Sequence, residues 1–408
     1  MKHSATIAWV FYDIALHGYA LMIPSVGFAI YFTSFVAANH VFADGLWSIA
    51  VSIPLIIAGL LSPWLGAMAD SNGHRRAMLA GATLLCVTAS ALMSTIGQGD
   101  IKLGMLLFIV AQVGYLLALA IYNSYLPLLS TSETSARISG IAWGLSYLGG
   151  IACFLLCRPF IGPGIQAGNE SYFANAFLVT AGFLLTLGMS SLLGFPRSTK
   201  DESKISNANP YRQLWNTVSS WRHEREIPRF LMAYYLINDA VVTVIYFMAI
   251  FLKTTFGLDM QEVLILSLLL QLIAIPSTIF FGWLGDRWSQ FGSVIVTLVI
   301  WALVLALIAF AEGENAPMFI VATLGLVLGS TQSLLRSMYS RMIPQGRAGE
   351  YFGFHALAGR ASSALGPLMF GAVSAMAGSQ RIAMASLGVF LLAGAAMLAY
   401  SKFSVCRR

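Results

Sequence analysis

The chain has 408 residues, of which 58% are hydrophobic and only 10% are charged, and its net charge is +6. Soluble domains carry roughly 25% charged residues, so this composition leaves no room for a sizeable water-soluble domain. The basic residues follow membrane sidedness, as shown below, so the positive charge does not indicate nucleic-acid binding. The sequence also lacks the G-x-S-x-G, H-E-x-x-H, C-x-x-C and phosphate-loop motifs. We therefore expect no enzyme, no cofactor and no metal site.

Apolar stretches follow one another along the chain, each near the roughly 20 residues that a membrane-spanning helix needs. The first lacks a convincing cleavage site and is expected to be a retained helix rather than a signal peptide. We predict an all-α membrane protein with twelve transmembrane helices in two pseudo-symmetric six-helix halves. The predicted spans are 5–37, 45–68, 76–97, 103–129, 137–158, 171–195, 229–256, 261–284, 291–311, 316–341, 350–377 and 380–402.

A polar connector at 196–228 divides these spans. It predicts an N-terminal six-helix bundle at 1–195, a cytoplasmic linker at 196–228 and a C-terminal six-helix bundle at 229–408. Trp215, Trp221 and the basic residues of the connector favour an amphipathic segment on an anionic membrane surface. A solvated linker is the alternative.

Lysines and arginines are distributed unevenly between alternate connectors. Seventeen lie in one set of connectors and tails, and only four, Lys102, Arg158, Lys253 and Arg381, lie in the opposite set. Cytoplasmic loops are enriched in these residues, so both termini are predicted to be cytoplasmic. The short loops and compact chain favour the inner (plasma) membrane of a bacterium. We expect the lipid bilayer, a small-molecule solute and protons as partners, and a monomer.

A turn of the form G-x-x-x-D-x-x-G-x-[RK]-[RK] joins the second and third predicted helices and recurs in the second half. Its glycines allow close approach of helices, and its aspartate can cap a helix N-terminus or pair with a cation. The second copy is degraded, since Ser289 stands where a glycine is expected and the basic end is absent. An ordinary positive-inside turn is the alternative. The candidate gating residues are Gly66, Asp70, Gly73, Arg75 and Arg76 in the first copy, and Gly282, Asp286 and Arg287 in the second.

Ionisable residues also fall inside predicted spans, where they are costly and generally face a cavity or a partner. At 1.5 Å per residue, Asp13 lies about 12 Å and Asp239 about 15 Å from the cytoplasmic ends of their helices. Burial favours the protonated form of a carboxyl group, and a nearby guanidinium favours the charged form. Asp239 and Asp13 could thus carry a proton. A static ion pair of Asp239 with Arg360 or Arg336 is the alternative. The ionisable candidates are Asp13, His17, Asp239, Arg336, His355 and Arg360.

Uncharged polar and aromatic residues cluster at similar depth. Because buried polar groups need hydrogen-bond partners, either a ligand or another helix must supply them. These remaining residues of the predicted cavity are Tyr12, Tyr122, Asn123, Tyr125, Asn238, Thr243, Tyr246, Gln271 and Gln332. Cys153 and Cys157 share a helix face, and we expect small core residues there rather than a soft-metal site.

These motifs together resemble the "unknown major facilitator" branch of the major facilitator superfamily, which includes the autophagy-related vacuolar amino-acid effluxers. The resemblance covers nearly the whole chain. Its residues are Trp9-x-x-Tyr12-Asp13-x-Ala15, Tyr122-Asn123-Ser-Tyr-Leu-Pro127, Ser139-Gly140 with Tyr147-Leu-Gly149-Gly150, Ala233-Tyr234 with Asn238-Asp239 and Thr243, Gly329-Ser-Thr-Gln332-Ser-Leu-Leu-Arg336-Ser, Ile343-Pro344 with Glu350-Tyr-Phe352-Gly353, and Gly366-Pro367.

The resemblance implies the major facilitator fold, a solute site between the two halves near mid-membrane, and a latch role for the glycine–aspartate turns. The chain departs from the family pattern at Leu16 and Val242, where asparagines are usual, and at Arg360, where lysine is common. Arginine keeps its charge and suits carboxylates. These departures weaken the inference of amino-acid specificity.

The leading hypothesis is a secondary active transporter, coupled to protons, that moves a small organic solute such as an amino acid or other carboxylate by alternating access. Arg360 or Arg336 would meet the carboxylate of the solute. One alternative is an exporter or importer of a larger amphiphile, such as a drug or siderophore. Another is a non-transporting membrane sensor or scaffold with the 196–228 segment as its output surface.

Overall fold

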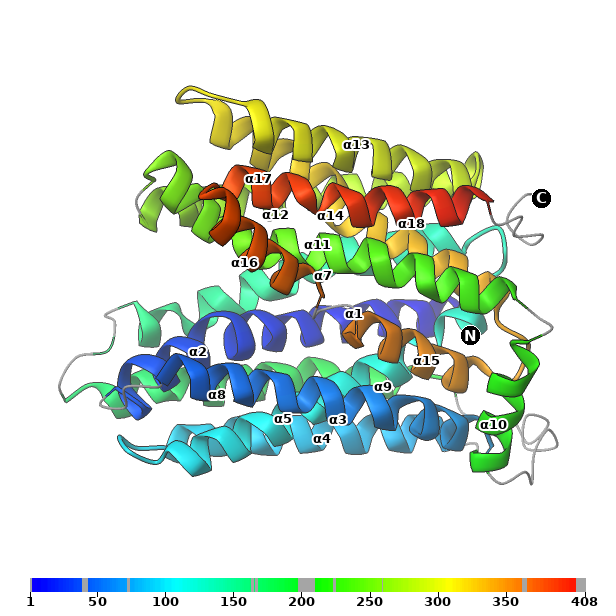
Figure 1. Cartoon of the computed structure of the whole chain (residues 1–408). Coiled ribbons are helices and arrows are strands. Elements are labelled where there is room, and N and C mark those ends of the chain that lie inside the picture. Colours follow the sequence, from blue (N-terminus) through cyan, green and yellow to red (C-terminus); the bar gives the residue numbers. More distant parts are fainter. Residues whose placement is uncertain are drawn as a thin grey trace. The chain divides into compact units, whose positions relative to one another are not determined.

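The computed structural model describes residues 2–38, 43–71, 74–162, 165, 168–196, 210–222, 225–258, 260–361 and 365–400. Every regular element in these ranges is a helix, as Figure 1 shows. Eleven helical stretches in the described ranges are long and apolar enough to cross a membrane, so the prediction of an all-α membrane protein is confirmed. They are Ser4–Val36, Leu46–Asp70, Arg75–Thr95, Ile101–Leu129, Ser135–Ile161, Glu170–Leu192, Glu226–Met248, Ile265–Arg287, Gln290–Phe310, Ala316–Met342 and Gln380–Tyr400.

The span predicted at 350–377 corresponds to two shorter helices. α15 covers Ala348–Ala361 and α16 covers Leu365–Ala377, and residues 362–364 lie outside the described part of the chain. Neither helix alone reaches the roughly 20 residues that a bilayer crossing needs. The two facing ends, at Ala361 and Leu365, are close to polar side chains that are described in the next subsection.

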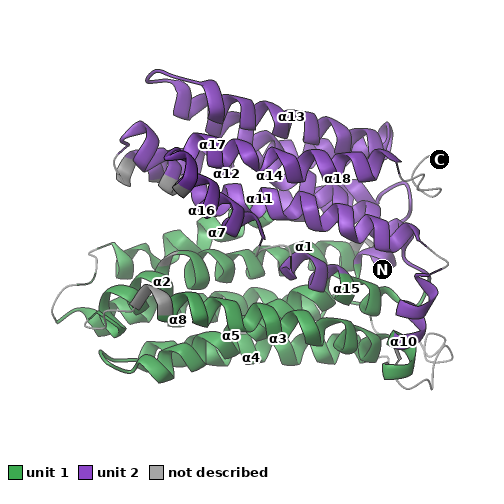
Figure 2. Ribbon diagram, in the orientation of Figure 1, with its two compact units in different colours: residues 1–125, 145–214, 345–354 green, residues 126–144, 215–344, 355–408 purple. Residues whose placement is uncertain are grey.

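The chain forms two compact units, coloured in Figure 2. Unit 1 consists of Met1–Tyr125, Leu145–Leu214 and Gln345–Phe354, and unit 2 of Leu126–Gly144, Trp215–Pro344 and His355–Arg408. Each unit therefore includes a short segment from the other half of the sequence. The division into bundles at 1–195 and 229–408 stays a prediction.

In unit 1, two π-helical turns divide the first span, and the first of them contains a proline. The span runs through α1 (Lys2–Ala20), a π-helical turn (Leu21–Val26), α2 (Gly27–Tyr31) and a second π-helical turn (Phe32–Val36). Pro24 has no N–H to donate to the carbonyl of Ala20, and the Ser25 hydroxyl donates to that carbonyl instead, at 2.8 Å. The other elements of unit 1 are α3 (Ala43–Ser71), α4 (Arg75–Leu92), a 3₁₀ turn (Met93–Thr95), α5 (Ile101–Asn123), α8 (Glu170–Phe183), a π-helical turn (Leu184–Met189), α9 (Ser190–Leu192), and the parts of α7 (Ser135–Ile161), α10 (Pro210–Ser220) and α15 that fall in its ranges.

Unit 2 is built mainly on the second half of the chain. Its long helices α11, α12 and α14 carry most of the residues considered below. Its elements are α6 (Leu126–Leu129), the first part of α7, the end of α10, α11 (Glu226–Phe256), α12 (Met260–Arg287), α13 (Gln290–Phe310), α14 (Ala316–Met342), the end of α15, α16, α17 (Gln380–Ser386) and α18 (Gly388–Tyr400).

Cys153 and Cys157 lie in a buried cluster with Met22 and Ala176. The Cys157 sulfur is 3.5 Å from the Thr180 hydroxyl oxygen. The described residues contain no group of three or more His, Cys, Asp or Glu side chains arranged for a metal ion. The surroundings of both cysteines are those of small core residues.

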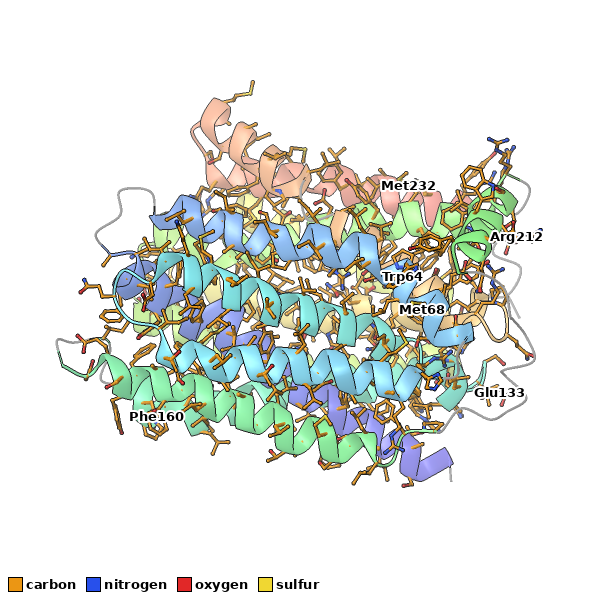
Figure 3. All side chains as sticks on the ribbon, turned by 90° about the horizontal axis from the view of Figure 1, so that it is seen from below. Trp64, Met68, Glu133, Phe160, Arg212 and Met232 are labelled. Carbon is orange, nitrogen blue, oxygen red and sulfur yellow. The ribbon has the colours of Figure 1, made fainter. Side chains whose placement is uncertain are left out.

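Large apolar side chains are exposed on parts of the surface, among them Met232, which Figure 3 labels. On α3, Ile56 and Leu60 lie one helical turn apart and are 62% and 68% exposed. Such positions suit a lipid environment, where an exposed aliphatic side chain is not in contact with water.

Candidate functional site

The carboxylate of Asp70, at the end of α3, caps the N-terminus of α15. Its Oδ1 accepts a hydrogen bond from the Gly349 N–H and its Oδ2 from the Glu350 N–H, each at 2.9 Å. The first N–H groups of a helix have no partner inside the helix, and the helix dipole favours negative charge there. The Arg75 guanidinium, from the start of α4, forms an ion pair with the same carboxylate. Asp70 thus connects three helices within unit 1.

Two glycines let α3 and α15 approach closely. A Cβ on Gly66 would meet the carbonyl group of Gly349, and a Cβ on Gly349 would lie 2.8 Å from Oδ1 of Asp70. Any larger residue would push the capped helix end away from the carboxylate. In the same predicted turn, Arg76 is half-buried, and Gly73 lies outside the described residues.

Asp286, at the end of α12, makes the corresponding arrangement in unit 2. Its Oδ1 accepts from the Ala136 N–H at 3.0 Å and its Oδ2 from the Arg137 N–H at 2.7 Å. These N–H groups belong to the first turn of α7. Nη2 of Arg341, at the end of α14, lies 2.9 Å from Asp286 Oδ1. A second aspartate therefore caps a helix from the other half of the sequence.

The helix crossing at Asp286 also depends on glycine. A Cβ on Gly282 would lie 2.6 Å from the carbonyl oxygen of Ala136 and 2.9 Å from Cα of Gly140. The second turn lacks the basic end of the motif, and the structure supplies Arg341 as the basic partner of Asp286. Arg287, which we singled out, is exposed and lies 5.9 Å from the Trp283 ring. No local sequence signal connects residues 286 and 341.

Further polar contacts surround each capped helix end. In unit 1, Glu350 is fully buried, accepts three charged hydrogen bonds from Arg347 Nη2 and Nε at 2.8–3.0 Å, and accepts from Gln213 Nε2 at 2.6 Å. In unit 2, the Ser135 hydroxyl accepts from Arg341 Nε at 2.9 Å and from Gln290 Nε2 at 3.1 Å. Buried side chains thus hold both helix starts in place.

The predicted cavity residues of the first half gather around α1 and α5. The Tyr12 hydroxyl lies 2.5 Å from the Thr83 hydroxyl, and the Tyr12 ring stacks on Tyr122 with centroids 5.4 Å apart. Asp13 is buried on the same helix, and His17 packs against the Tyr147 ring at 5.3 Å. The remaining predicted members are Asn123, which is half-buried, and Tyr125, whose ring lies 5.5 Å from the Arg75 guanidinium.

Two neighbouring residues of α11 bind the facing ends of α15 and α16. Asn238 Nδ2 donates to the Gly359 carbonyl at 3.2 Å, near the end of α15. Asp239 Oδ1 accepts from the Gly366 N–H at 2.9 Å, at the start of α16. A helix C-terminus leaves carbonyls unpaired and a helix N-terminus leaves N–H groups unpaired, so an amide donor and a carboxylate acceptor suit these two ends.

Asp239 is fully buried, and its second oxygen, Oδ2, has no hydrogen-bond partner among the described residues. The Thr243 hydroxyl donates to the Asp239 backbone carbonyl at 2.7 Å, not to the carboxylate. The described residues also show no ion pair between Asp239 and Arg360 or Arg336. A buried carboxylate held mainly by one backbone N–H is poorly compensated when charged.

Arg336 is held by the first part of α7. Its Nε donates to the Ser139 hydroxyl at 2.9 Å, its Nη2 donates to the Ser139 carbonyl at 3.0 Å, and its guanidinium lies 4.9 Å from the Trp143 ring. His355 is buried and stacks on the Tyr234 ring with centroids 4.0 Å apart. Sequence alone did not identify Ser139 or Trp143 as partners of Arg336.

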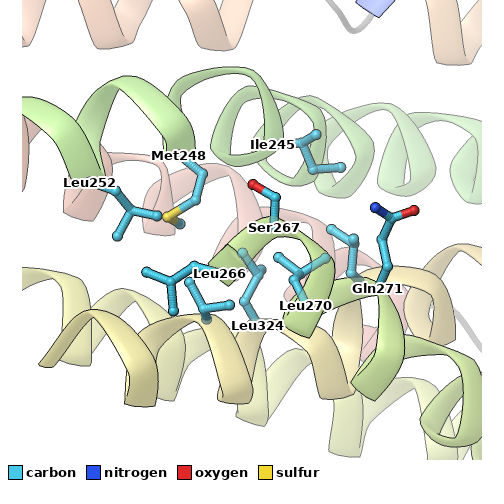
Figure 4. A pocket seen from close by; sticks show the side chains of 10 residues that line it. Ile245, Met248, Leu252, Leu266, Ser267, Leu270, Gln271 and Leu324 are labelled. Atoms are coloured by element: carbon cyan, nitrogen blue, oxygen red, sulfur yellow. The ribbon is translucent and has the colours of Figure 1, made fainter. Parts of the chain in front are cut away.

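The remaining predicted residues of the second half are more scattered. Tyr246 is 57% exposed, while Gln332 and Arg360 are half-buried. Gln271 lines a cavity of about 230 Å³ between α11, α12 and α14, with Ser267 as its other polar residue, and Figure 4 shows both among aliphatic side chains. Apolar side chains such as Ile245, Met248 and Leu324 form most of this cavity.

The chain is similar to known transporters over most of its length. A family model described as "Vacuole effluxer Atg22 like" matches residues 39–406. An uncharacterized MFS-type transporter, YxiO of Bacillus subtilis, is 25% identical over 406 residues, covering 96% of this chain and 94% of that protein. The multi-drug resistance efflux pump PmrA homolog of Lactococcus lactis is 22% identical, over 96% of this chain and 93% of that protein.

The fold resembles that of solved major facilitator superfamily (MFS) transporters. The structure of FucP from E. coli, in the outward conformation, matches with a TM-score of 0.77. The match covers 98% of both chains at 14% sequence identity. At this identity the likeness concerns the fold.

Proposed function

Since the chain belongs to the Atg22-like vacuole effluxer family and has the fold of MFS transporters, we propose that it couples solute movement to protons. As a member of this family it is a transporter and not an enzyme. The proposed solute is a small organic molecule, an amino acid or another carboxylate, that is moved by alternating access.

The buried carboxylate of Asp239 carries the proposal. Its Oδ1 accepts from the Gly366 N–H, and its Oδ2 is without a partner among the described residues. When charged, Asp239 stabilises the positive end of α16, an effect worth roughly 0.3–1 kcal/mol at exposed helix ends and up to about 2 kcal/mol in partly buried ones. When protonated, it loses most of this interaction. One proton thereby alters how α16 is held.

Protonation of Asp239 would also free N–H groups that bind anions. A helix N-terminus is suited to a carboxylate, so the carboxylate of the solute could take the place of the Asp239 charge at α16. Arg360, one residue beyond Gly359, is the basic residue nearest in sequence to this position. Arg336 is a weaker candidate, because Ser139 and Trp143 already hold its guanidinium.

The two capped helix ends support a gating role on the side predicted to be cytoplasmic. Asp70 joins α3 to α15, and Asp286 joins α12 to α7. In each case the aspartate and the capped helix come from different halves of the sequence. Both joints would have to open before a solute could pass on that side. The proposed setting is a bacterial inner membrane with both termini cytoplasmic, and the proposed state is a monomer.

The test is proton flux in proteoliposomes, followed with a pH-sensitive dye while amino acids, organic acids and amphiphilic cations are added in turn. We expect one class of carboxylate solute to drive a flux that Asp239→Asn abolishes. Glu314→Gln is the matched control, because Glu314 is exposed. A flux unchanged in Asp239→Asn would exclude Asp239 as the proton carrier.

An exporter of larger amphiphiles is the second candidate. The cavity of about 230 Å³ that Gln271 lines is mostly apolar, and Leu16 and Val242 reduce polarity in the two helices that carry the aspartates. The Lactococcus lactis relative is named as a multi-drug efflux pump. A flux driven by amphiphilic cations and insensitive to carboxylates would favour this second function.

A further inference from the structure

α10 (Pro210–Ser220) lies in the segment that connects the two halves of the sequence, and it presents three different faces. Successive residues of an α-helix are about 100° apart, so residues three, four and seven apart lie together. Tyr211, Trp215 and Val218 form an apolar face that is exposed, Arg212, Asn216 and Ser219 form a polar face that is also exposed, and Gln213, Leu214 and Thr217 form a face that is half-buried or buried.

The third face is held by the protein. Gln213 Nε2 donates to Oε2 of the fully buried Glu350 at 2.6 Å, and Thr217 is 1% exposed. At the first turn, the Tyr211 ring lies 6.4 Å from the Trp64 ring of α3. These contacts fix the rotation of α10 about its own axis.

The apolar face, in contrast, is largely exposed. Trp215 is 73% exposed and Tyr211 is 68% exposed. Trp64, which contacts Tyr211, lies one helical turn from Leu60, and Leu60 belongs to the apolar outer surface of α3. Figure 3 shows Trp64 and Met68 toward the end of α3 at which Arg212 lies. The apolar face therefore begins where a membrane-facing surface ends, which is where tryptophan and tyrosine are enriched.

The charges near this face are predominantly positive. Arg212 lies on the polar face, Arg222 follows the end of α10, and Arg225 and Arg229 lie at the start of α11; all four are exposed. Exposed basic residues beside an apolar helix face bind anionic lipid headgroups, and the attraction grows with each basic residue near the surface.

We infer that α10 lies in the membrane–water interface as a lipid-binding helix. Its apolar face enters the boundary between headgroups and acyl chains, its polar face points to water, and its arginines contact the phosphate groups of anionic lipids. The inference needs only that the neighbouring helices span a membrane, so it stands or falls independently of the solute and of proton coupling.

A spin label in nanodiscs tests this arrangement. Trp215→Cys and the matched control Asn216→Cys place a label on the apolar and the polar face of the same turn. Both variants are made in a Cys406→Ser background, since Cys86, Cys153 and Cys157 are fully buried. The measurement compares collisions of each label with oxygen, which concentrates in lipid, and with a water-soluble nickel complex. The nanodiscs contain phosphatidylglycerol or only phosphatidylcholine.

We expect the label at 215 to collide mainly with oxygen and the label at 216 mainly with the nickel complex. Without phosphatidylglycerol, the oxygen preference at 215 should fall at least about twofold, because the arginines then lack anionic partners. A nickel preference at both positions would overturn the inference in favour of a solvated linker. Protection of the 215 label from both reagents would also overturn it, by indicating a protein partner. An oxygen preference independent of lipid charge would contradict the role of the arginines.

Discussion

Asp70 in unit 1 and Asp286 in unit 2 make the same kind of helix cap, but their arginine partners come from different places in the sequence. Each caps the first turn of a helix from the other half of the sequence and binds one guanidinium. For Asp70 the cation is Arg75, five residues away, whereas for Asp286 it is Arg341, on a different helix. A repeat that has degraded in sequence can thus keep its geometry when a distant residue replaces the missing charge.

The largest expected effect is on amide exchange at the two capped helix ends, where it should distinguish the Asp70 site from the Asp286 site. Asp70→Ala should speed backbone amide exchange in residues 345–354 but not in 130–140, and Asp286→Ala should do the reverse. Removing one partner of a buried ion pair costs about 3–5 kcal/mol, which corresponds to roughly 100-fold or more in exchange rate. Hydrogen–deuterium exchange of the purified protein measures this. Equal changes in both segments from either substitution would show that the sites are not separate.

The next largest effect on amide exchange concerns the arginine that pairs with Asp286. Arg341→Gln should speed exchange at Ala136 and Arg137 by roughly tenfold or more, since a hydrogen bond to a charged group contributes about 1.5–3 kcal/mol. Arg287→Gln is the matched control, because Arg287 belongs to the sequence motif but is exposed beside Trp283. The reverse ranking would show that the motif residue, and not Arg341, serves Asp286.

The close helix approach at Gly66 and at Gly282 should contribute similarly to the stability of both sites. Gly66→Ala and Gly282→Ala each place a Cβ against a backbone carbonyl of the opposing helix, and overpacking of this kind costs about 1–3 kcal/mol. Both variants should melt at a lower temperature than the native chain. In Gly81→Ala the Cβ meets no atom within 4 Å, so this control should be neutral or slightly stabilised. Comparable melting of all three variants would contradict the close approach.

The smallest expected effect on amide exchange concerns the hydrogen bond between Gln213 and Glu350 at the first site. Gln213→Leu removes the hydrogen bond to Glu350, a loss of about 0.5–1.5 kcal/mol. Exchange should rise modestly in 345–354 and stay unchanged in 130–140. Asn216→Leu, on the exposed polar face of the same helix, should alter neither segment. Faster exchange in 130–140 would contradict the assignment of the Gln213 hydrogen bond to the first site alone.

Much of this organisation could be predicted from sequence because it depends on local patterns. Apolar runs of sufficient length predicted the helical membrane fold, and the G-x-x-x-D spacing predicted that Asp70 and Asp286 matter. Partners from distant helices could not be predicted. Arg341, Gly349 and Ser139 reach their partners through tertiary packing, and spacing along the chain carries no information about it. The division of the predicted span 350–377 into α15 and α16 was also missed, since its second part is apolar throughout.

Asp239 was predicted as a candidate because a carboxylate at membrane depth is costly. Its actual partner, the Gly366 N–H at the start of α16, depends on where that helix begins. The sequence suggested an arginine partner instead, and the described residues form no ion pair with Asp239. A backbone partner changes the expected consequence of protonation from breaking an ion pair to releasing a helix end.

The most direct test of the central claim is solute accumulation in proteoliposomes with an imposed pH gradient, compared with solute exchange in the same vesicles. The account predicts that Asp239→Asn abolishes accumulation driven by the pH gradient but retains exchange, because the proton carrier is lost while the solute path remains. Undiminished accumulation in Asp239→Asn would contradict the account.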